Sequence, residues 1–470
     1  MGSIGTQDED SHNSVLSMDS TFILTRIAAG RLKEISAGNF STEVRQKATL
    51  TLLDFLGAAQ SGLLLPLSHS VLKYAARHPD QPEAYVFGIE KAMSAETAAF
   101  TNTVLAHCAA RDDMHLDSCA HMGGIVVSTV LAISQRDKWT GEQIIRGIIG
   151  GYEMGAVLGT AIRSSGSFNK HLRPSGLIGA FAAASAAIAA TYGDEEVAVD
   201  ALSLAVNMAC GVNEWAHTGG EEIFIQNGTA SRAGITAYDQ ARCGITSSDS
   251  VLEGRDGFLR AVNAGPDAAN TFRNWIQTSP VGRGIIDVRF KPAPTCNFTQ
   301  TTSALALRLA QRKIDMAELQ QINITTTSGA MAYPGCNNAG PLRSSASGKL
   351  SIQYGVCAAL AFGRLDEECL ARVRHESVNR LMAKCSVAAD STYDDKYKEG
   401  LQPARIELVL HNGTVLREEA SDVPWLNGPE VIARFLREIS PLLSEEKAQR
   451  LLYRCQHLGD TDIRGDLLGV

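Results

Sequence analysis

Residues 180–190 consist of alanine interrupted only by single phenylalanine, serine and isoleucine residues, so a helix there is apolar on nearly every face. Such a helix needs other elements on all sides, which predicts a central, buried position. Four further segments rich in small residues have helical periodicity: 125–134, 141–162, 197–210 and 228–243. We therefore predict that residues 21–270 form a large all-α domain.

After residue 270, segments with the alternating pattern of β-strands appear among the helical segments. Residues 321–327 alternate like a strand, and residues 404–419 predict a β-hairpin whose two-residue turn is Asn412-Gly413. Because helical segments separate these strands, residues 271–427 are expected to form a smaller α+β lid domain.

The two ends of the chain complete this organisation. Helices at 430–443 and 445–458 predict that the segment 428–470 returns to the helical domain. Residues 1–20 are polar and acidic and are expected to be a disordered tail. The predicted fold class is therefore mainly α, with a large helical domain and a smaller α+β lid.

Charge and cysteine usage limit the partners. A net charge of −8 over 470 residues argues against nucleic acid and anionic membranes as partners. The ten cysteines include no C-x-x-C pair, so neither a zinc site nor a disulfide framework is expected. The first 20 residues carry no apolar signal-peptide core, and we expect a cytoplasmic protein in a reducing compartment.

A dense polar cluster lies between apolar segments at residues 111–124. It holds three carboxylates and two histidines within ten positions: Asp112, Asp113, His115, Asp117 and His121. Burying such a cluster is costly unless its members pair with one another or with a ligand, and burial displaces their pKa values. The cluster therefore indicates an enzyme active site based on acid–base chemistry. Metal ligation by the same residues is the weaker alternative, because no second ligand cluster accompanies them.

Several short sequence motifs, and the order in which they occur along the chain, resemble those of the MmgE/PrpD family, which includes 2-methylcitrate dehydratase and cis-aconitate decarboxylase. They are Asp112-Asp113-Met114-His115, His121-Met122-Gly123, residues 150–155, the phrase that begins at Arg173-Pro174, Asp256-Gly257-Phe258-Leu259, residues 290–296, residues 349–354 and the late hairpin. The resemblance covers roughly residues 20–460. It implies a helical domain, an α+β lid, an active site between them and a homodimer. It also implies lyase chemistry on a small-molecule polycarboxylate of the citrate type, with no cofactor and no metal.

The resemblance also assigns provisional roles within the polar cluster. His121 is the first candidate for the proton-transferring residue, although a buried structural histidine is the alternative. Asp112 or Asp113 is expected to act as a base or to orient a histidine, and a helix-capping role competes with that. His115 is a weaker catalytic candidate.

Substrate binding is assigned to five further residues: Arg173, Lys291, Lys349, Cys296 and His171. Relatives commonly have histidine where this chain has Arg173, which stays charged and suits carboxylate binding but not proton shuttling. Decarboxylase-type relatives carry a Lys-x-x-His phrase where this chain has Ile223 to Gln226. Cys296 also lies near a position that is histidine in some decarboxylases.

These departures favour one reaction over another. The expected function is dehydration of a 2-methylcitrate-like or alkylcitrate-like substrate. A long alkyl arm on the substrate would explain the apolar Ile223-Phe224-Ile225 stretch, and a repacked core would explain it equally well. Decarboxylation of cis-aconitate is the nearest alternative, followed by an epimerase or isomerase that removes an α-proton. A non-catalytic descendant of the family is the alternative from a different functional class.

Overall fold

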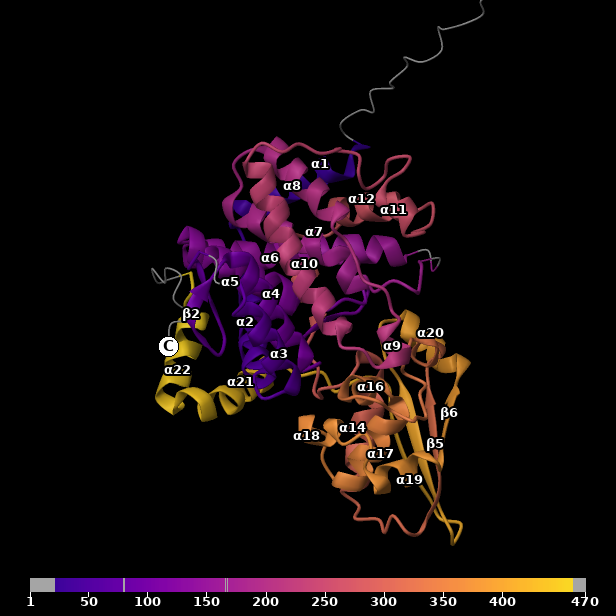
Figure 1. Cartoon of the computed structure of the whole chain (residues 1–470). Helices are drawn as coiled ribbons and strands as arrows, with labels where there is room; N and C mark the ends of the chain where they lie inside the picture. Colours follow the sequence, from indigo (N-terminus) through magenta and orange to yellow (C-terminus); the bar gives the residue numbers. More distant parts are fainter. Residues whose placement is uncertain (1–21, 79–80, 165, 167, 460–470) are drawn as a thin grey trace, which may run out of the picture.

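The computed structural model describes residues 22–78, 81–164, 166 and 168–459, so the predicted tail at 1–20 lies outside the described residues. Helices occupy most of the chain, and the upper part of the molecule in Figure 1 is helical while the lower part contains the main sheet. The predicted mainly-α fold class is confirmed.

The helical part is built around helix α7 (Pro174–Thr191), in which every residue from Pro174 to Ala190 is buried. The surrounding helices are α4 (Ala95–Cys108), α5 (Gly123–Asp137), α6 (Gly141–Arg163), α8 (Glu195–Asn207) and α10 (Glu222–Arg242). Glycines on α6 permit the close approach to α7. A Cβ atom at Gly150 would lie 2.3 Å from Cβ of Ala189. The predicted central helix is thus found, two turns longer than the alanine-rich run.

Helix α7 also has the length and composition of a membrane span, but 94% of its 18-residue window is buried in the protein. Among the described residues, only the pair α2 (Thr42–Gly62) and α3 (Pro66–Ala75), bent by 97°, passes the same test when it is counted as one span. A core helix of a helical domain meets these criteria equally well.

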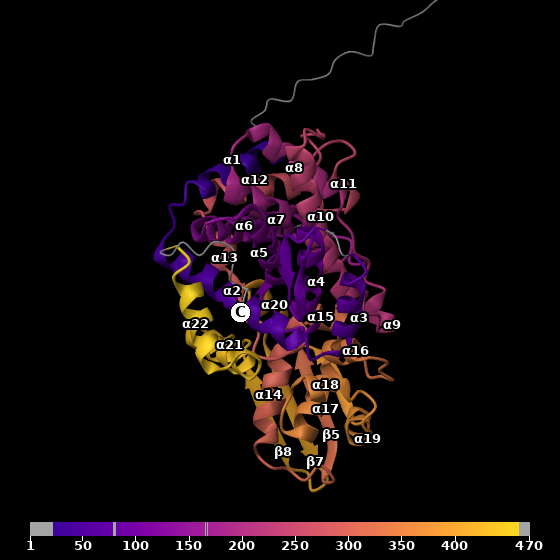
Figure 2. The ribbon, with the colours of Figure 1, turned by 60° about the vertical axis from the view of Figure 1, so that its left-hand side comes forward.

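The N-terminal and C-terminal helices pack against each other. Helix α2 begins after Ser41, whose hydroxyl accepts a hydrogen bond from the Val44 amide and caps the helix. Helices α21 (Gly428–Leu443) and α22 (Glu445–Gln456) lie beside it (Figure 2), and the apolar face of α21 joins the same core. The remaining elements of this part are α1 (Leu24–Ser36), α9 (Trp215–Thr218), α11 (Phe258–Ala261), α12 (Ala268–Thr278), α13 (Arg283–Ile286) and the hairpin β1 (Ala84–Val86) and β2 (Ile89–Met93).

The second part contains a four-stranded sheet in the order β6-β5-β7-β8. Its strands are β5 (Leu319–Thr326), β6 (Cys385–Ala389), β7 (Ala404–Leu410) and β8 (Val415–Ala420). Helices α14 (Gln300–Ala310) and α17 (Ile352–Phe362) pack in a separate hydrophobic cluster with the buried faces of β5 and β7. Short elements complete it: η2 (Asn297–Thr299), α15 (Ser328–Ala332), α16 (Ser345–Leu350), α18 (Glu367–Ala371), α19 (Glu376–Met382) and α20 (Ser391–Lys398).

The β7–β8 hairpin differs from its prediction in one respect. The Leu410 amide donates to the Thr414 carbonyl, and the Gly413 amide donates to the Leu410 carbonyl, so three residues form the loop. Gly413 has a φ of +83°, which a glycine adopts without strain. The predicted two-residue turn is therefore wrong. Gly413 instead adopts the left-handed backbone conformation at the last position of a three-residue loop.

The helical part and the sheet-containing part meet at a second small strand pair. Strand β3 (Met114–His115) pairs antiparallel with β4 (Val288–Arg289), and Phe290 bridges to Leu426. This pairing fixes the polar cluster at residues 111–124 directly against the segment that carries Lys291 and Cys296. It places most of the predicted site in one region.

Candidate active site

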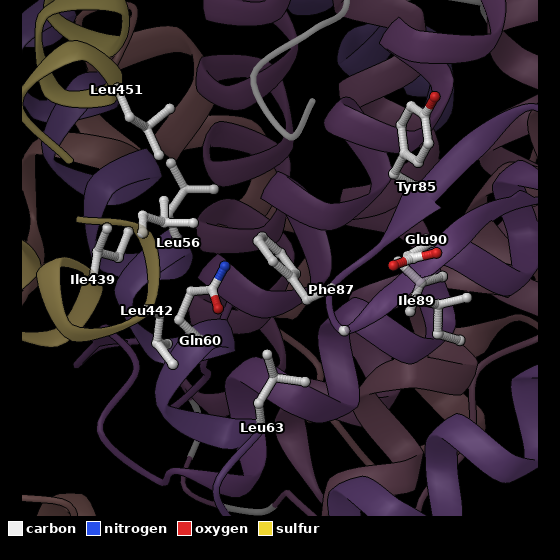
Figure 3. Close-up of a pocket in the computed structure, with 13 residues that line it drawn as sticks. Leu56, Gln60, Leu63, Tyr85, Phe87, Ile89, Glu90, Ile439, Leu442 and Leu451 are labelled. Atoms are coloured by element: carbon white, nitrogen blue, oxygen red, sulfur yellow. The ribbon is translucent and has the colours of Figure 1, made fainter. Parts of the chain in front are cut away.

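Two cavities differ sharply in chemistry. A groove of about 570 Å³ lies between α2, the β1–β2 hairpin and the C-terminal helices, and its wall is mainly apolar (Figure 3). Glu90 and Tyr85 are its only titratable lining groups among the described residues. A smaller cavity, of about 40 Å³, is enclosed by residues from both parts of the protein. Its lining is His107, Ala110, His121, Arg173, Trp215, Ile223, Phe224, Lys291, Thr295, Cys296, Tyr333, Ala346, Lys349 and Leu350. The concentration of basic groups makes the smaller cavity the candidate active site.

His121 is held in a single orientation at this cavity. Its Nδ1 atom lies 2.8 Å from the carbonyl oxygen of Asp113, and its backbone amide donates to the Ser175 hydroxyl at 3.0 Å. A carbonyl only accepts, so Nδ1 carries the proton and Nε2 keeps its lone pair. Burial, aided by the positive charge of Lys291, lowers the pKa of His121 to about 3. His121 is therefore a neutral imidazole with an unprotonated Nε2.

Behind His121 lies a buried chain of three charged or polar groups. The Asp112 carboxylate lies 2.6 Å from Nδ1 of His107, and Nη2 of Arg173 lies 2.6 Å from Nε2 of His107. Because a guanidinium only donates, His107 accepts at Nε2 and donates from Nδ1 to Asp112. Burial lowers the pKa of His107. Burial opposes ionisation of Asp112, yet His107, His121 and Lys291 together hold the pKa of that carboxyl well below its usual range.

Arg173 is tied to the protein at both terminal nitrogens. Nη1 donates to the Ile223 carbonyl at 2.6 Å and to Oδ1 of Asn227 at 2.7 Å, while Nη2 donates to His107. Three of its five N–H groups are thus used, which leaves two for a ligand. Arg173 supplies a fixed positive charge to the cavity and also sets the tautomer of His107.

The two lysines of the cavity have different electrostatic surroundings. Nζ of Lys291 donates to the Ala110 carbonyl at 2.6 Å and lies 3.7 Å from Oδ1 of Asp112, and burial lowers its pKa. Nζ of Lys349 donates to the Cys108 carbonyl at 2.6 Å and pairs with the Glu367 carboxylate at 2.7 Å. With both histidines neutral, Arg173 and these two lysines outnumber Asp112 and Glu367 by one positive charge. The cavity therefore favours an anionic ligand.

Four of the predicted residues do not line the cavity: Asp112, which lies behind it against His107, and Asp113, His115 and His171. The Asp113 carboxylate accepts from the Gly123 amide at 2.9 Å and from the Tyr152 hydroxyl, which anchors the start of α5, and burial raises its pKa to about 7. His115 accepts from the Ser118 amide within the turn, and burial lowers its pKa to about 4. His171 is exposed. Asp113 contributes to the site through its backbone carbonyl, which orients His121.

His107, Trp215 and Tyr333 line the cavity although they were not predicted as site residues. His107 could have been found, because it lies in the last turn of helix α4, only five residues before Asp112. Nothing in the local sequence signals Trp215 or Tyr333, which reach the cavity from α9 and the end of α15. The described residues contain no group of three or more histidine, cysteine, aspartate or glutamate side chains arranged to hold a metal ion.

A buried ion-pair network links the backbone of the site to helices α2 and α21. Arg111 and Arg434 both contact Oδ1 of Asp54, and Arg111 also pairs with Glu438 on α21. Nη1 of Arg434 donates to the Lys291 carbonyl at 2.6 Å. The C-terminal helix α21 thereby fixes the backbone of a cavity residue.

Comparison with known proteins is consistent with this arrangement. The family profile described as the MmgE/PrpD N-terminal domain matches residues 28–271, and the profile of the MmgE/PrpD C-terminal domain matches residues 293–458. A cis-aconitate decarboxylase from Aspergillus terreus is 22% identical over 429 residues, which cover 87% of this chain and 86% of that protein. The cis-aconitate decarboxylase of A. terreus strain NIH 2624 / FGSC A1156 matches to the same extent.

Proposed function

This chain belongs to the MmgE/PrpD family, and we propose that it is a lyase acting on a citrate-type polycarboxylate, most specifically by dehydration of a 2-methylcitrate-like or alkylcitrate-like substrate. The observation that carries the proposal is the neutral His121 imidazole beside two buried cations. Its Nε2 lone pair faces a cavity whose net charge is positive.

The proposed mechanism follows from this geometry. His121 removes the proton from the carbon next to a substrate carboxylate. That carbon acid is weak, so the charge that develops on the carboxylate oxygens needs stabilisation by Lys291 and Arg173. The neighbouring C–O bond then breaks, and the hydroxide leaves as water after it takes a proton from the imidazolium. Asp112 holds His107 and balances part of the cationic charge throughout.

One wall of the cavity supports an alkyl-bearing substrate. Trp215, Ile223, Phe224 and Leu350 form the apolar part of the lining. A second carboxylate placed against this wall would lose its hydration without gaining an ionic partner. An alkyl substituent gains free energy there, at about 25 cal/mol per Å² of apolar surface buried.

Decarboxylation of cis-aconitate is the second candidate, because both A. terreus relatives carry that name. The cavity does not favour it, since Ile223 and Gln226 stand where decarboxylase-type relatives have lysine and histidine. In that reaction His121 would act as an acid toward the carbanion left by CO2, which requires it to be protonated first.

The test is NMR of the purified, metal-free enzyme in D2O with citrate, 2-methylcitrate, a longer alkylcitrate and cis-aconitate. The proposal predicts an aconitate-type product from the alkylcitrates, faster than from citrate. Itaconate from cis-aconitate would replace it with decarboxylation, and deuterium exchange without net reaction would indicate an epimerase or isomerase. No reaction with any of the four would favour a non-catalytic role.

Assembly and compartment remain predictions: the dimer follows from the family resemblance, and the compartment follows from the composition of the sequence. We propose a homodimer in the cytoplasm, with no nucleic-acid or membrane partner. Light scattering coupled to size-exclusion chromatography tests the dimer, and a monomer at micromolar concentration would contradict it.

A further inference from the structure

Two cysteine thiols lie side by side at the cavity. Sγ of Cys296 is 3.8 Å from Sγ of Cys336. Cys296 lines the cavity, whereas Cys336 lies behind it and is completely buried. Both thiols are free. A disulfide requires a sulfur–sulfur distance of about 2.05 Å, so a shift of less than 2 Å would join them.

The surroundings of Cys296 ease the ionisation of its thiol. The hydrogen bond from the Cys336 thiol lowers the pKa of Cys296 against the effect of burial, and the charges of Lys291 and Arg173 act in the same direction. The thiolate is the form that attacks electrophiles and oxidants. Cys296 therefore has the properties of an attacking sulfur and Cys336 the position of a resolving one.

The cavity has room for a small oxidant. Its volume of about 40 Å³ exceeds the roughly 10–15 Å³ of cavity that one water molecule needs. Hydrogen peroxide, with two oxygen atoms and no other heavy atom, is small enough to reach Cys296.

We propose that Cys296 and Cys336 form a modification site for hydrogen peroxide, which converts them into a disulfide in the cavity wall. The Cys296 thiolate attacks one peroxide oxygen, the O–O bond breaks, and the departing hydroxide takes a proton to become water. The Cys336 sulfur then attacks the resulting sulfenic acid. Its S–O bond breaks, and the second hydroxide leaves as water with the Cys336 proton. Two thiols are oxidised, and one peroxide is reduced to two waters.

A second thiol pair shows that distance alone does not define the site. Sγ of Cys357 lies 3.3 Å from Sγ of Cys385, closer than the cavity pair. Cys357 is completely buried in the core of the sheet-containing part, and burial keeps its pKa well above the usual value. This pair lines none of the cavities described above and serves as an internal control.

The experiment treats the reduced full-length protein with hydrogen peroxide and maps its peptides by mass spectrometry. We expect a Cys296–Cys336 cross-linked peptide that has lost two hydrogens and that dithiothreitol restores. In Cys336→Ala, Cys296 should instead gain two oxygens as sulfinic acid, which dithiothreitol does not reverse. Cys385→Ala should behave like the wild type.

None of these readouts depends on enzymatic activity. A cross-link from Cys296 to a cysteine other than Cys336, or oxidation of Cys357 and Cys385 before the cavity pair, would overturn the proposal. Because these readouts are peptide masses, they test the thiol pair independently of the proposed lyase reaction.

Discussion

Replacement of Asp112 by asparagine tests whether this carboxylate holds the cationic cavity together. Asp112 is 2% exposed, and its Oδ1 lies 3.7 Å from Nζ of Lys291. At that distance the attraction is about 4 kcal/mol for an effective dielectric constant of about 20. The asparagine carbonyl can still accept from His107, but its amide then faces the lysine. We expect the free energy of unfolding to fall by about 3–5 kcal/mol, the usual cost of breaking one side of a buried ion pair.

The same substitution should strengthen the effect of an anionic ligand. It raises the net charge of the cavity from one positive charge to two, so citrate should stabilise Asp112→Asn more than it stabilises the wild type. Urea unfolding followed by tryptophan fluorescence, with and without citrate, measures both effects. Asp117→Asn is the matched control, because Asp117 is exposed and its loss should change stability by less than about 0.5 kcal/mol. Equal stability of the two variants, or a weaker citrate effect in Asp112→Asn, would refute the reasoning.

Three further substitutions test other parts of the account. Burial raises the pKa of Asp113 to about 7 from an ordinary 3.8, so the folded protein holds this proton more tightly than the unfolded chain and its stability falls as pH rises between these values. Asparagine does not titrate, so the free energy of unfolding of Asp113→Asn should gain up to about 4 kcal/mol relative to wild type between pH 4 and 7.5. The midpoints of urea unfolding measure this difference. Arg434→Met should lose about 3–5 kcal/mol in the same assay, whereas Arg450→Met, on an exposed pair of α22, should lose less than about 1 kcal/mol. Ile223→Lys should shift selectivity in kcat/KM from an alkylcitrate toward citrate by roughly tenfold, because it places a cation on the apolar wall.

The helical core was predictable because its signal is local. The alanine-rich run at 180–190 has no polar face, so α7 is found where expected. The hairpin turn was harder to predict. Whether Asn412-Gly413 forms a complete turn or ends a three-residue loop depends on the register of β7 against β8, which places Val409 opposite Val415.

The site was predictable in composition but not in side-chain direction. Of the nine proposed site residues, the cavity brings His121, Arg173, Lys291, Lys349 and Cys296 together. Adjacent aspartates in the loop point to different partners, Asp112 to His107 and Asp113 to Tyr152, and sequence spacing does not reveal which one faces the site. The pairing of Lys349 with Glu367 likewise depends on contacts made only in the folded protein.

The central claim is that Nε2 of His121 removes the substrate proton. The most direct measurement is the rate of deuterium incorporation and product formation in D2O with an alkylcitrate, for His121→Gln beside His171→Asn, which alters an exposed histidine. The account predicts that His121→Gln loses both by about 10²–10⁴-fold, while His171→Asn keeps the wild-type rate. Wild-type exchange and turnover in His121→Gln would contradict it.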